Sequence, residues 1–174
     1  IKDLRTLLVN CKLKIVNLSR IECFDVAHLA GASPTASMVT FINGEADKSF
    51  YRHFRIRQKK GADDISSLGE VAKRRSKHFG SWGSPDLIMV DGGKTQVSAF
   101  YEVLKEFNIP IVGLAKRFEI LIIPVTEGKK LIFIERKVPK GSALNLVQRM
   151  RNEAHRFARR YHHHLIRKSL IPFS

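Results

Sequence analysis

The feature that most constrains the fold is a short apolar run, Leu-Ile-Met-Val, which ends directly in Asp91. A run this short, without polar alternation, is typical of a strand that is buried on both faces of a sheet. We therefore predict a strand at residues 86–91, a helix at residues 94–107 and a second buried strand at residues 111–116. Strands that alternate with helices in this way indicate the parallel part of an α/β sheet.

A second group of strands is expected before the parallel ones. Residues 20–31 are rich in β-branched and aromatic residues, which predicts a strand. Residues 34–56 contain two apolar segments separated by Asn43-Gly44, a dipeptide typical of the tight turn of a hairpin. Three strands in this order predict an antiparallel meander.

The remaining segments are a later hairpin and the helices. The hairpin strands are expected at residues 119–125 and 129–135. From the spacing of apolar residues, helices are expected at residues 2–12, 65–79 and 142–168, and a loop at residues 80–85. The chain therefore predicts an α/β fold. Its mixed sheet combines an antiparallel three-strand meander with parallel strands, is flanked by helices and ends in a long basic C-terminal helix.

The charge of the chain bears on its partners. Thirty-one Lys and Arg residues against sixteen Asp and Glu give a net charge of +15, which favours binding to nucleic acid. Cys11 and Cys23 lack zinc-finger spacing, so a reducing, intracellular setting is expected. No apolar run approaches the roughly 20 residues of a membrane span. The first residue is Ile1 rather than Met, which suggests a piece of a longer polypeptide.

The Gly92-Gly93-Lys94-Thr95 turn has two possible explanations, of which the first is a phosphate-binding P-loop. That motif requires G-x-x-x-x-G-K-[ST], and its leading glycine would have to stand where this chain has Ile88, inside the strand. An extended backbone cannot curl round a phosphate, so the P-loop is rejected. A G-x-G-x-x-G fingerprint is absent as well.

The second explanation is a carboxylate that holds a metal ion at the edge of the sheet. Asp25 also ends an apolar strand, so Asp25 and Asp91 would lie together if their strands are neighbours. Two close carboxylates repel each other unless a cation lies between them, and Mg²⁺ prefers such oxygens. Such an ion could activate water against a phosphodiester. Without that role, the two residues would be ordinary caps at strand ends.

Six segments together resemble the C-terminal endonuclease domain of UvrC, the excinuclease subunit of bacterial nucleotide excision repair. In chain order they are IECFDVAH, YRHFRI, GADDISSLGEVAKRR, PDLIMVDGGKTQ, GLAKR and LVQRMRNEAHRFARRYHHHL. The resemblance implies a ribonuclease-H-like fold and a metal-dependent endonuclease that cuts DNA on the 5′ side of a lesion. It also implies that the endonuclease domain covers residues 19–168, after a lead-in helix or linker at 1–18 and before a tail at 169–174.

The resemblance assigns catalytic roles motif by motif. The aspartates of ECFD and VDGGK are Asp25 and Asp91, and the histidine of NEAHRF is His155; these three form the implied metal-binding set. His155 is either a ligand or a proton carrier, and the sequence does not choose. Asp64, in GADD, matches a further position needed for incision, although it could merely cap the helix that begins at Ile65.

Several basic residues and one tyrosine are the expected DNA contacts. Lys94 would hold a phosphate or the attacking water, unless it is an ordinary residue of the first helical turn. Contacts to backbone phosphates are expected from Tyr51, Arg52, Lys116, Arg149, Arg151 and Arg156, and from Arg159, Arg160, Arg167 and Lys168 further along the last helix. Their affinity would fall steeply with salt and read little sequence. The run His162–His164 is interpreted as surface, because consecutive helical residues point in different directions.

The resemblance further implies a cofactor, partners and a setting. Mg²⁺ or Mn²⁺ is the expected cofactor, and damaged double-stranded DNA is the expected substrate. UvrB is the expected protein partner, through a segment absent here, with UvrA acting earlier. The expected location is the bacterial cytoplasm, associated with the nucleoid and not with a membrane. Asn152 replaces an aspartate usual in the family, which weakens the expected support for His155.

Two rival functions remain open at this point. The first is a DNA-binding module that keeps the fold and has lost cleavage. The second is another ribonuclease-H-like enzyme, such as a resolvase or a ribonuclease specific for RNA–DNA hybrids.

Overall fold

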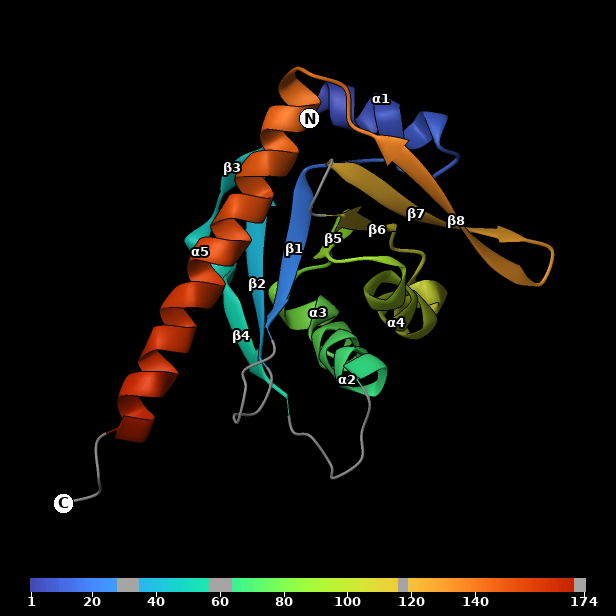
Figure 1. The fold of residues 1–174 in the computed structure, drawn as a ribbon. Coiled ribbons are helices and arrows are strands. Elements are labelled where there is room, and N and C mark those ends of the chain that lie inside the picture. Colours follow the sequence, from blue (N-terminus) through green and yellow to red (C-terminus); the bar gives the residue numbers. More distant parts are fainter. Residues whose placement is uncertain (28–34, 57–63, 116–118, 171–174) are drawn as a thin grey trace.

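The computed structural model describes residues 1–27, 35–56, 64–115 and 119–170, which form one mixed sheet with helices on both faces (Figure 1). The elements are α1 (Lys2–Asn10), β1 (Arg20–Ala27), β2 (Thr35–Ile42), β3 (Glu45–Ala46), β4 (Arg52–Arg55), α2 (Asp64–Ser76), α3 (Phe79–Trp82), β5 (Leu87–Asp91), α4 (Lys94–Leu104), β6 (Ile111–Ala115), β7 (Ile120–Glu127), β8 (Lys130–Lys137) and α5 (Ser142–Leu170). In the described chain the strand order is β3-β2-β1-β5-β6-β7-β8, and β4 also pairs with β2. The predicted α/β fold class is confirmed.

The central strands β1, β5 and β6 run parallel; the apolar runs predicted this for β5 and β6, and β1 joins them while also pairing with β2. Every residue of β5 is buried, because helices cover both faces of the sheet at this point. In the register of β1 with β5, Asp25 lies opposite Asp91. The carboxyl ends of three neighbouring strands therefore meet at one edge of the sheet.

The predicted meander is present, but its third strand is interrupted. β2 pairs antiparallel with β1, and the chain then turns at Asn43 and Gly44, whose φ angles are 50° and 86°. A 3-10 turn at Lys48–Phe50 separates β3 from β4, and both of these strands pair with β2. The Asp47 carboxylate accepts hydrogen bonds from the backbone N–H and the hydroxyl of Ser49 at 3.0 and 2.6 Å. These local bonds favour a turn over a continuous strand.

The later hairpin follows its prediction closely. β7 and β8 pair antiparallel from Ile120 opposite Lys137 to Glu127 opposite Lys130, and Gly128 turns the chain with φ 59°. β7 also pairs antiparallel with β6, which adds the hairpin to the edge of the parallel strands (Figure 1).

The loop predicted at residues 80–85 is wrong in its first half. Gly80–Trp82 belong to α3, a single helical turn, in which the Trp82 N–H donates to the His78 carbonyl at 2.8 Å. The His78 and Trp82 rings stack at 3.9 Å, and the Arg75 guanidinium lies 4.8 Å from the Phe79 ring. Contacts from α2 therefore stabilise a turn that the local sequence, with two glycines, does not favour.

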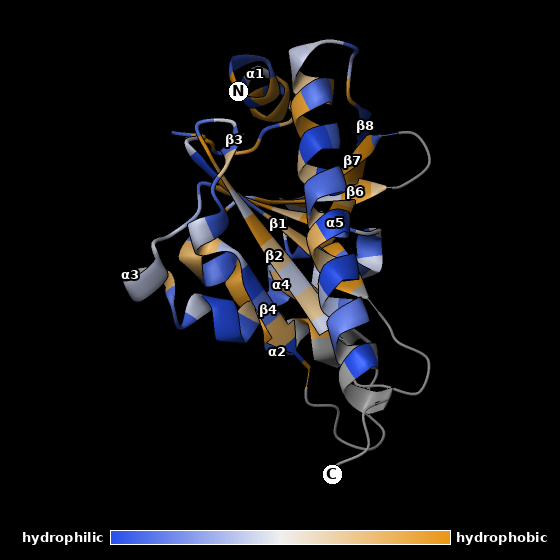
Figure 2. Ribbon diagram, turned by 90° about the vertical axis from the view of Figure 1, so that its left-hand side faces the viewer, coloured by the Kyte–Doolittle hydropathy of each residue, from blue (hydrophilic) through white to orange (hydrophobic). Residues whose placement is uncertain are grey.

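Each face of the sheet has its own hydrophobic core. On one face, Phe24, Ile88 and Val90 pack against α2 and α4. On the other face, Cys23 and Met89 pack against α1 and α5. Figure 2 shows the corresponding apolar colouring of the strands between the two helical layers. Side chains of neighbouring positions alternate between these cores, as the geometry of a strand requires.

A fully buried ion pair lies in the layer of α2 and α3. Arg75 donates from Nε and Nη2 to both carboxylate oxygens of Glu22 at 2.7 and 2.6 Å, and also to the Gly83 carbonyl at 2.5 Å. Arg20 adds bonds to Glu22 at 3.1 and 2.9 Å. Neither Arg75 nor Glu22 has any exposed surface. Their pairing therefore ties the end of α2 to β1.

The apolar stripe predicted for the last helix is also present. Val147, Met150 and Ala154 are fully buried, so this side of α5 lies against the sheet. Further along, Phe157 and Tyr161 hold the His53 ring of β4 between them, at centroid distances of 3.8 and 4.0 Å. Burial lowers the pKa of His53 to about 4. Among the described helices, none carries a stretch that is long and apolar enough to span a bilayer.

The buried ion pair leads to a first prediction. Replacing Arg75 by Met leaves the Glu22 carboxylate buried with only Arg20 as a partner, and should lower the free energy of unfolding by about 3 kcal/mol. The double variant Glu22→Leu/Arg75→Met should be more stable than Arg75→Met, since neither buried charge remains. Urea unfolding at neutral pH measures both. Equal stability of the single and double variants would contradict this account of the pair.

The stacked histidine leads to a second prediction. In the unfolded chain His53 takes up a proton near its ordinary pKa of about 6.5, whereas in the folded chain it does so only near pH 4. The unfolded state therefore binds more protons in this window, and folding should lose stability as the pH falls from about 6.5 to about 4. The variant His53→Phe keeps a ring in the stack and lacks this titration. In urea unfolding, the stability of this variant should rise relative to that of the original chain as the pH falls through this window. If the difference in unfolding free energy stays constant with pH, His53 does not contribute in this way.

Candidate active site

Two carboxylates lie near the carboxyl ends of neighbouring parallel strands, on the same face of the sheet. Asp25 of β1 and Asp91 of β5 are partners in the strand register. Because side chains alternate along a strand, Asp25 shares a face with Cys23, and Asp91 shares that face with Met89. Cys23 and Met89 belong to the core under α5. The two aspartates therefore lie side by side and face α5, as their strand positions predicted.

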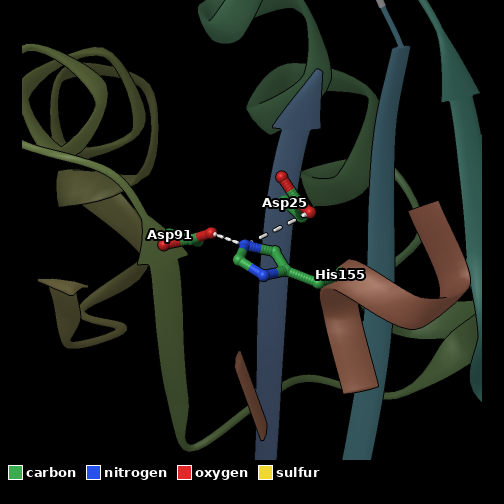
Figure 3. A group of neighbouring side chains, drawn as sticks. All are labelled: Asp25, Asp91 and His155. Carbon is green, nitrogen blue, oxygen red and sulfur yellow. Dashed lines mark hydrogen bonds and ion pairs between the residues drawn. The ribbon is translucent and has the colours of Figure 1, made fainter. Parts of the chain in front are cut away.

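The third member of the cluster comes from α5. The Nε2 atom of His155 is hydrogen-bonded to Oδ2 of Asp91 and lies 3.7 Å from Oδ2 of Asp25 (Figure 3). The neighbouring Ala154 is fully buried against the sheet, which fixes the rotation of the helix at this point. One possible ligand atom from each of the three residues lies within 4.8 Å of the others. Residues far apart in the sequence thus form one compact group.

The burial of this group fits a cation. The Asp91 side chain is fully buried, while those of Asp25 and His155 are 12% and 31% exposed. Among the described residues, none donates a hydrogen bond to Oδ1 of Asp91, although this atom is buried. A buried carboxylate oxygen without a donor is costly unless something else satisfies it. Carboxylate oxygens and an imidazole nitrogen are a donor set that divalent cations accept.

The pKa of the nearby Cys23 thiol responds to the negative charges of this cluster. Burial raises its pKa well above the ordinary value, and the charges of Asp91 and Asp25 raise it further. Arg151 opposes this effect. The thiol therefore stays protonated at neutral pH, and Cys23 serves as a small apolar residue of the core.

The glycine turn after β5 leads directly into α4. The Gly93 N–H donates to Oε1 of Gln96 at 2.9 Å, so the backbone enters the helix at once. Ile88, where a P-loop needs its first glycine, lies inside the buried strand β5. The rejection of a P-loop is confirmed. A Cβ on Gly92 would lie 2.7 Å from Cγ of Gln96, so the Gln96 side chain fits closely against this turn.

A cavity of about 430 Å³ opens at the carboxyl ends of the parallel strands. It is lined by Val26, Leu68, Asp91, Gly92, Gly93, Gln96 and Ala115. Asp91 belongs both to this cavity and to the cluster with His155, so the two adjoin at this residue. The cavity extends toward the side of the sheet covered by α2 and α4, because Leu68 and Gln96 lie on those helices.

Lys94 and Arg52, two predicted phosphate contacts, are already engaged within the protein. Lys94 pairs with Glu135 of β8 at 2.9 Å, and both side chains are about half exposed. Arg52 donates from Nη1 to the carbonyls of Ser49 and Tyr51 at 2.9 and 2.8 Å. Contact of either residue with DNA stays a prediction.

Tyr51, another predicted phosphate contact, is also engaged within the protein, and its contact with DNA stays a prediction. It is only 8% exposed, and its hydroxyl donates to Oε1 of Glu153 at 2.8 Å. Arg156 donates from Nε and Nη2 to the same carboxylate at 2.7 and 2.6 Å. The hydrogen bond from Arg156 chiefly lowers the pKa of Glu153, and burial chiefly raises that of Tyr51. Tyr51 therefore fixes Glu153, and through it Arg156, in the part of α5 that carries His155.

Arg149 and Arg151, two further predicted contacts on α5, are also paired with acids. Arg149 lies 2.7 Å from Glu45 of β3, and Arg151 lies 3.4 Å from Glu119. A phosphate that binds either guanidinium has to compete with its carboxylate.

Several predicted positions fall outside what the structure describes. Lys116 is not among the described residues. Asp64 is described only through its backbone, as the first residue of α2, one position before the predicted start of the helix. Its catalytic role therefore stays a prediction.

Sequence reasoning missed Glu153 and the buried pair of Glu22 with Arg75. The spacing of Glu153 and Arg156, three residues apart on a helix, was a usable signal for their contact. No local signal linked either residue to Tyr51, which is about a hundred positions away in the chain.

Comparison with known proteins agrees with this geometry. The family model described as the UvrC RNAse H endonuclease domain matches residues 11–158. The UvrABC system protein C of Chlorobaculum tepidum is 42% identical over 151 residues, which are 84% of this chain and 23% of that protein. The protein of the same name from Methanosarcina barkeri is 42% identical over 156 residues, 87% of this chain and 29% of that protein. The chain thus spans less than a third of these relatives.

Solved structures give more distant likenesses. A Ciona intestinalis endonuclease V in complex with DNA has a TM-score of 0.44 and 13% identity, over 67% of this chain and 59% of that one. Human ENDOV has a TM-score of 0.42 and 21% identity, over 57% of this chain and 46% of that one. The sequence relationship is far stronger, and by it this chain belongs to the family of UvrC ribonuclease-H-like endonuclease domains.

Proposed function

We propose that this domain is a divalent-metal-dependent endonuclease that hydrolyses a phosphodiester of damaged DNA on the 5′ side of a lesion. The single observation that carries the proposal is the convergence of Asp25, Asp91 and His155, from three distant segments, in a member of this family. Within that proposal the domain works as part of the UvrABC excinuclease of nucleotide excision repair.

Asp25 and Asp91 would hold Mg²⁺ or Mn²⁺. The unsatisfied Oδ1 of Asp91 supports this role, because a buried carboxylate oxygen needs a positive partner. When bound, the ion supplies Lewis acidity, which activates water and stabilises charge on the cleaved phosphodiester. By holding the ion in one place, the two carboxylates would fix where the phosphate binds.

His155 contributes through its Nε2 atom, which faces both carboxylates. This nitrogen would either coordinate the ion or exchange a proton with the attacking water and the leaving oxygen. Its hydrogen bond to Asp91 fixes the ring in the orientation that either role needs. Asp64 is proposed as a further catalytic residue, since α2 starts with it near the cavity residue Leu68.

The positive charge of α5 would bind the DNA backbone. Figure 2 shows mostly hydrophilic residues along the side of α5 that faces the viewer. Arg159 and Arg160 are exposed, and no described acidic residue forms an ion pair with either. Arg149, Arg151 and Arg156 would join them after exchanging a carboxylate for a phosphate, and Lys94, Arg52 and Lys116 are proposed as contacts near the strand ends.

The proposed partners and setting follow from the family. Damaged double-stranded DNA would be the substrate, and UvrB would bring the domain to it after UvrA has acted. The proposed location is the bacterial cytoplasm, in association with the nucleoid. Each of these belongs to the whole protein, of which this chain corresponds to a part.

The metal site leads to a third prediction. Asp25→Asn and Asp91→Asn should each lower nicking of a damaged duplex by about a thousandfold or more, because the cation loses a charged ligand. Binding of Mn²⁺, followed by electron paramagnetic resonance, should weaken in parallel, while DNA binding should persist or tighten. Asp3→Asn, which removes an exposed charge on α1, is the matched control and should change none of these.

Two outcomes would overturn the proposed function. Nicking that survives both substitutions would place the active site elsewhere. Cleavage of RNA–DNA hybrids or four-way junctions in preference to lesion-containing duplexes would favour a different ribonuclease-H-like enzyme.

The arginines of α5 lead to a fourth prediction. The plot of log affinity for duplex DNA against log salt should lose about 0.9 of its slope for each phosphate contact removed. Arg159→Gln/Arg160→Gln should therefore flatten it by about 1.8. Lys129→Gln/Lys130→Gln, in the turn between β7 and β8, removes the same charge and should leave the slope unchanged. Fluorescence anisotropy over about 50 to 200 mM salt measures both variants. If both variants lost the same amount of slope, total charge and not the position of the arginines would set the salt dependence of DNA binding.

A further inference from the structure

The cavity beside Asp91 is a feature that the proposed chemistry does not use. Its volume of about 430 Å³ lies within the range of small-molecule sites in proteins, about 300 to 1,000 Å³. It occupies the carboxyl edge of the parallel strands, the edge where open α/β sheets commonly bind their ligands.

Small residues keep this space open. Where β5 and β6 end, the lining consists of Gly92, Gly93 and Ala115, the smallest residues available. The neighbouring Gly113 of β6 also allows close packing, because a Cβ there would lie 2.8 Å from the Gly92 carbonyl oxygen. Larger side chains at the strand ends would fill the hollow between α2 and α4. The sequence thus builds a space at the point where the candidate metal site begins.

The chemistry of the walls suits a nucleobase. Val26, Leu68 and Ala115 provide apolar surface, which can pack against the flat faces of a base. Gln96 provides an amide whose Oε1 already accepts from the Gly93 N–H. None of the described residues accepts from its Nε2, so this group remains as a donor. Every base carries an acceptor at its edge, so one amide donor gives orientation without sequence preference.

Covalent geometry brings a nucleoside to this place. Asp91 lines the cavity and also belongs to the cluster with Asp25 and His155. A phosphate at that cluster would be bonded to a sugar on each side, so one adjoining nucleoside would come within reach of the strand ends where the cavity lies. We propose that the cavity receives one unstacked deoxynucleoside of the cut strand, adjacent to the scissile phosphate. This proposal rests on the proposed function and adds a subsite to it.

Unstacking a nucleotide costs a few kcal/mol in an intact duplex and least where pairing is already lost. A subsite of this kind therefore favours strands that are opened near a lesion. It gives the domain a means to prefer distorted DNA without reading sequence.

The test uses the whole 174-residue chain with labelled methyl groups of Ala, Val and Leu, in the presence of Ca²⁺. Titration with the dinucleotide pdApdT should shift the NMR signals of Val26, Leu68 and Ala115 and leave Val9 of α1 unchanged. Filling the space with Ala115→Phe should weaken dinucleotide binding about tenfold, which corresponds to about 1.4 kcal/mol. Ala46→Phe, an exposed position on β3, is the matched control and should bind as the original chain does.

Two results would overturn the subsite. Unchanged cavity methyl signals at saturating dinucleotide, in the original chain, would show that no nucleoside enters. Equal shifts with 2-deoxyribose 5-phosphate, which lacks a base, would show that the base is not what the cavity binds. Neither result touches the metal site, since Mn²⁺ binding and the effects of Asp25→Asn and Asp91→Asn are measured separately.

Discussion

The parallel register of β1 with β5 sets two negative charges next to each other, and the rest of the site is arranged around that juxtaposition. Asp25 and Asp91 cannot move apart without breaking the pairing of two central strands. Burial of the Asp91 side chain leaves little water to screen the repulsion between the two carboxylates. The Nε2 atom of His155 lies close to both carboxylates and is hydrogen-bonded to Asp91, which partly offsets their repulsion. Oδ1 of Asp91 still has no hydrogen-bond donor among the described residues, and a cation would satisfy it.

The same charges stand in a strongly basic molecule. The net charge of +15 draws a polyanion toward the protein as a whole, whereas the carboxylates repel it locally. A divalent ion at the cluster would remove this conflict, because its two positive charges would balance the charges of the two carboxylates. The arginines of α5 show a related balance. Arg149, Arg151 and Arg156 each have a glutamate partner, so the proposed DNA binding would exchange one anion for another and gain only the difference.

The elements that the sequence predicted well are those whose cause is local. Continuous apolar runs predicted β5 and β6, the Asn43-Gly44 turn predicted the start of the second hairpin strand, and the positions of Asp25 and Asp91 at strand ends predicted their meeting. His155 was different: only the family resemblance pointed to it, because its place depends on how α5 crosses the sheet. The role of Tyr51 in binding Glu153, and the helical turn α3, depend on contacts across long stretches of chain. No pattern of neighbouring residues encodes such contacts.

The length of α5 has a geometric consequence. Its 29 residues form one continuous helix of about 43 Å. His155 lies near its middle, and Arg159, Arg160 and Arg167 lie toward its C-terminal end. Phe157 and Tyr161, which flank Arg159 and Arg160 in the sequence, stack against the His53 ring of β4. Because one continuous helix carries all of these residues, the packing that places His155 beside the carboxylates also sets the direction in which the later arginines project from the sheet.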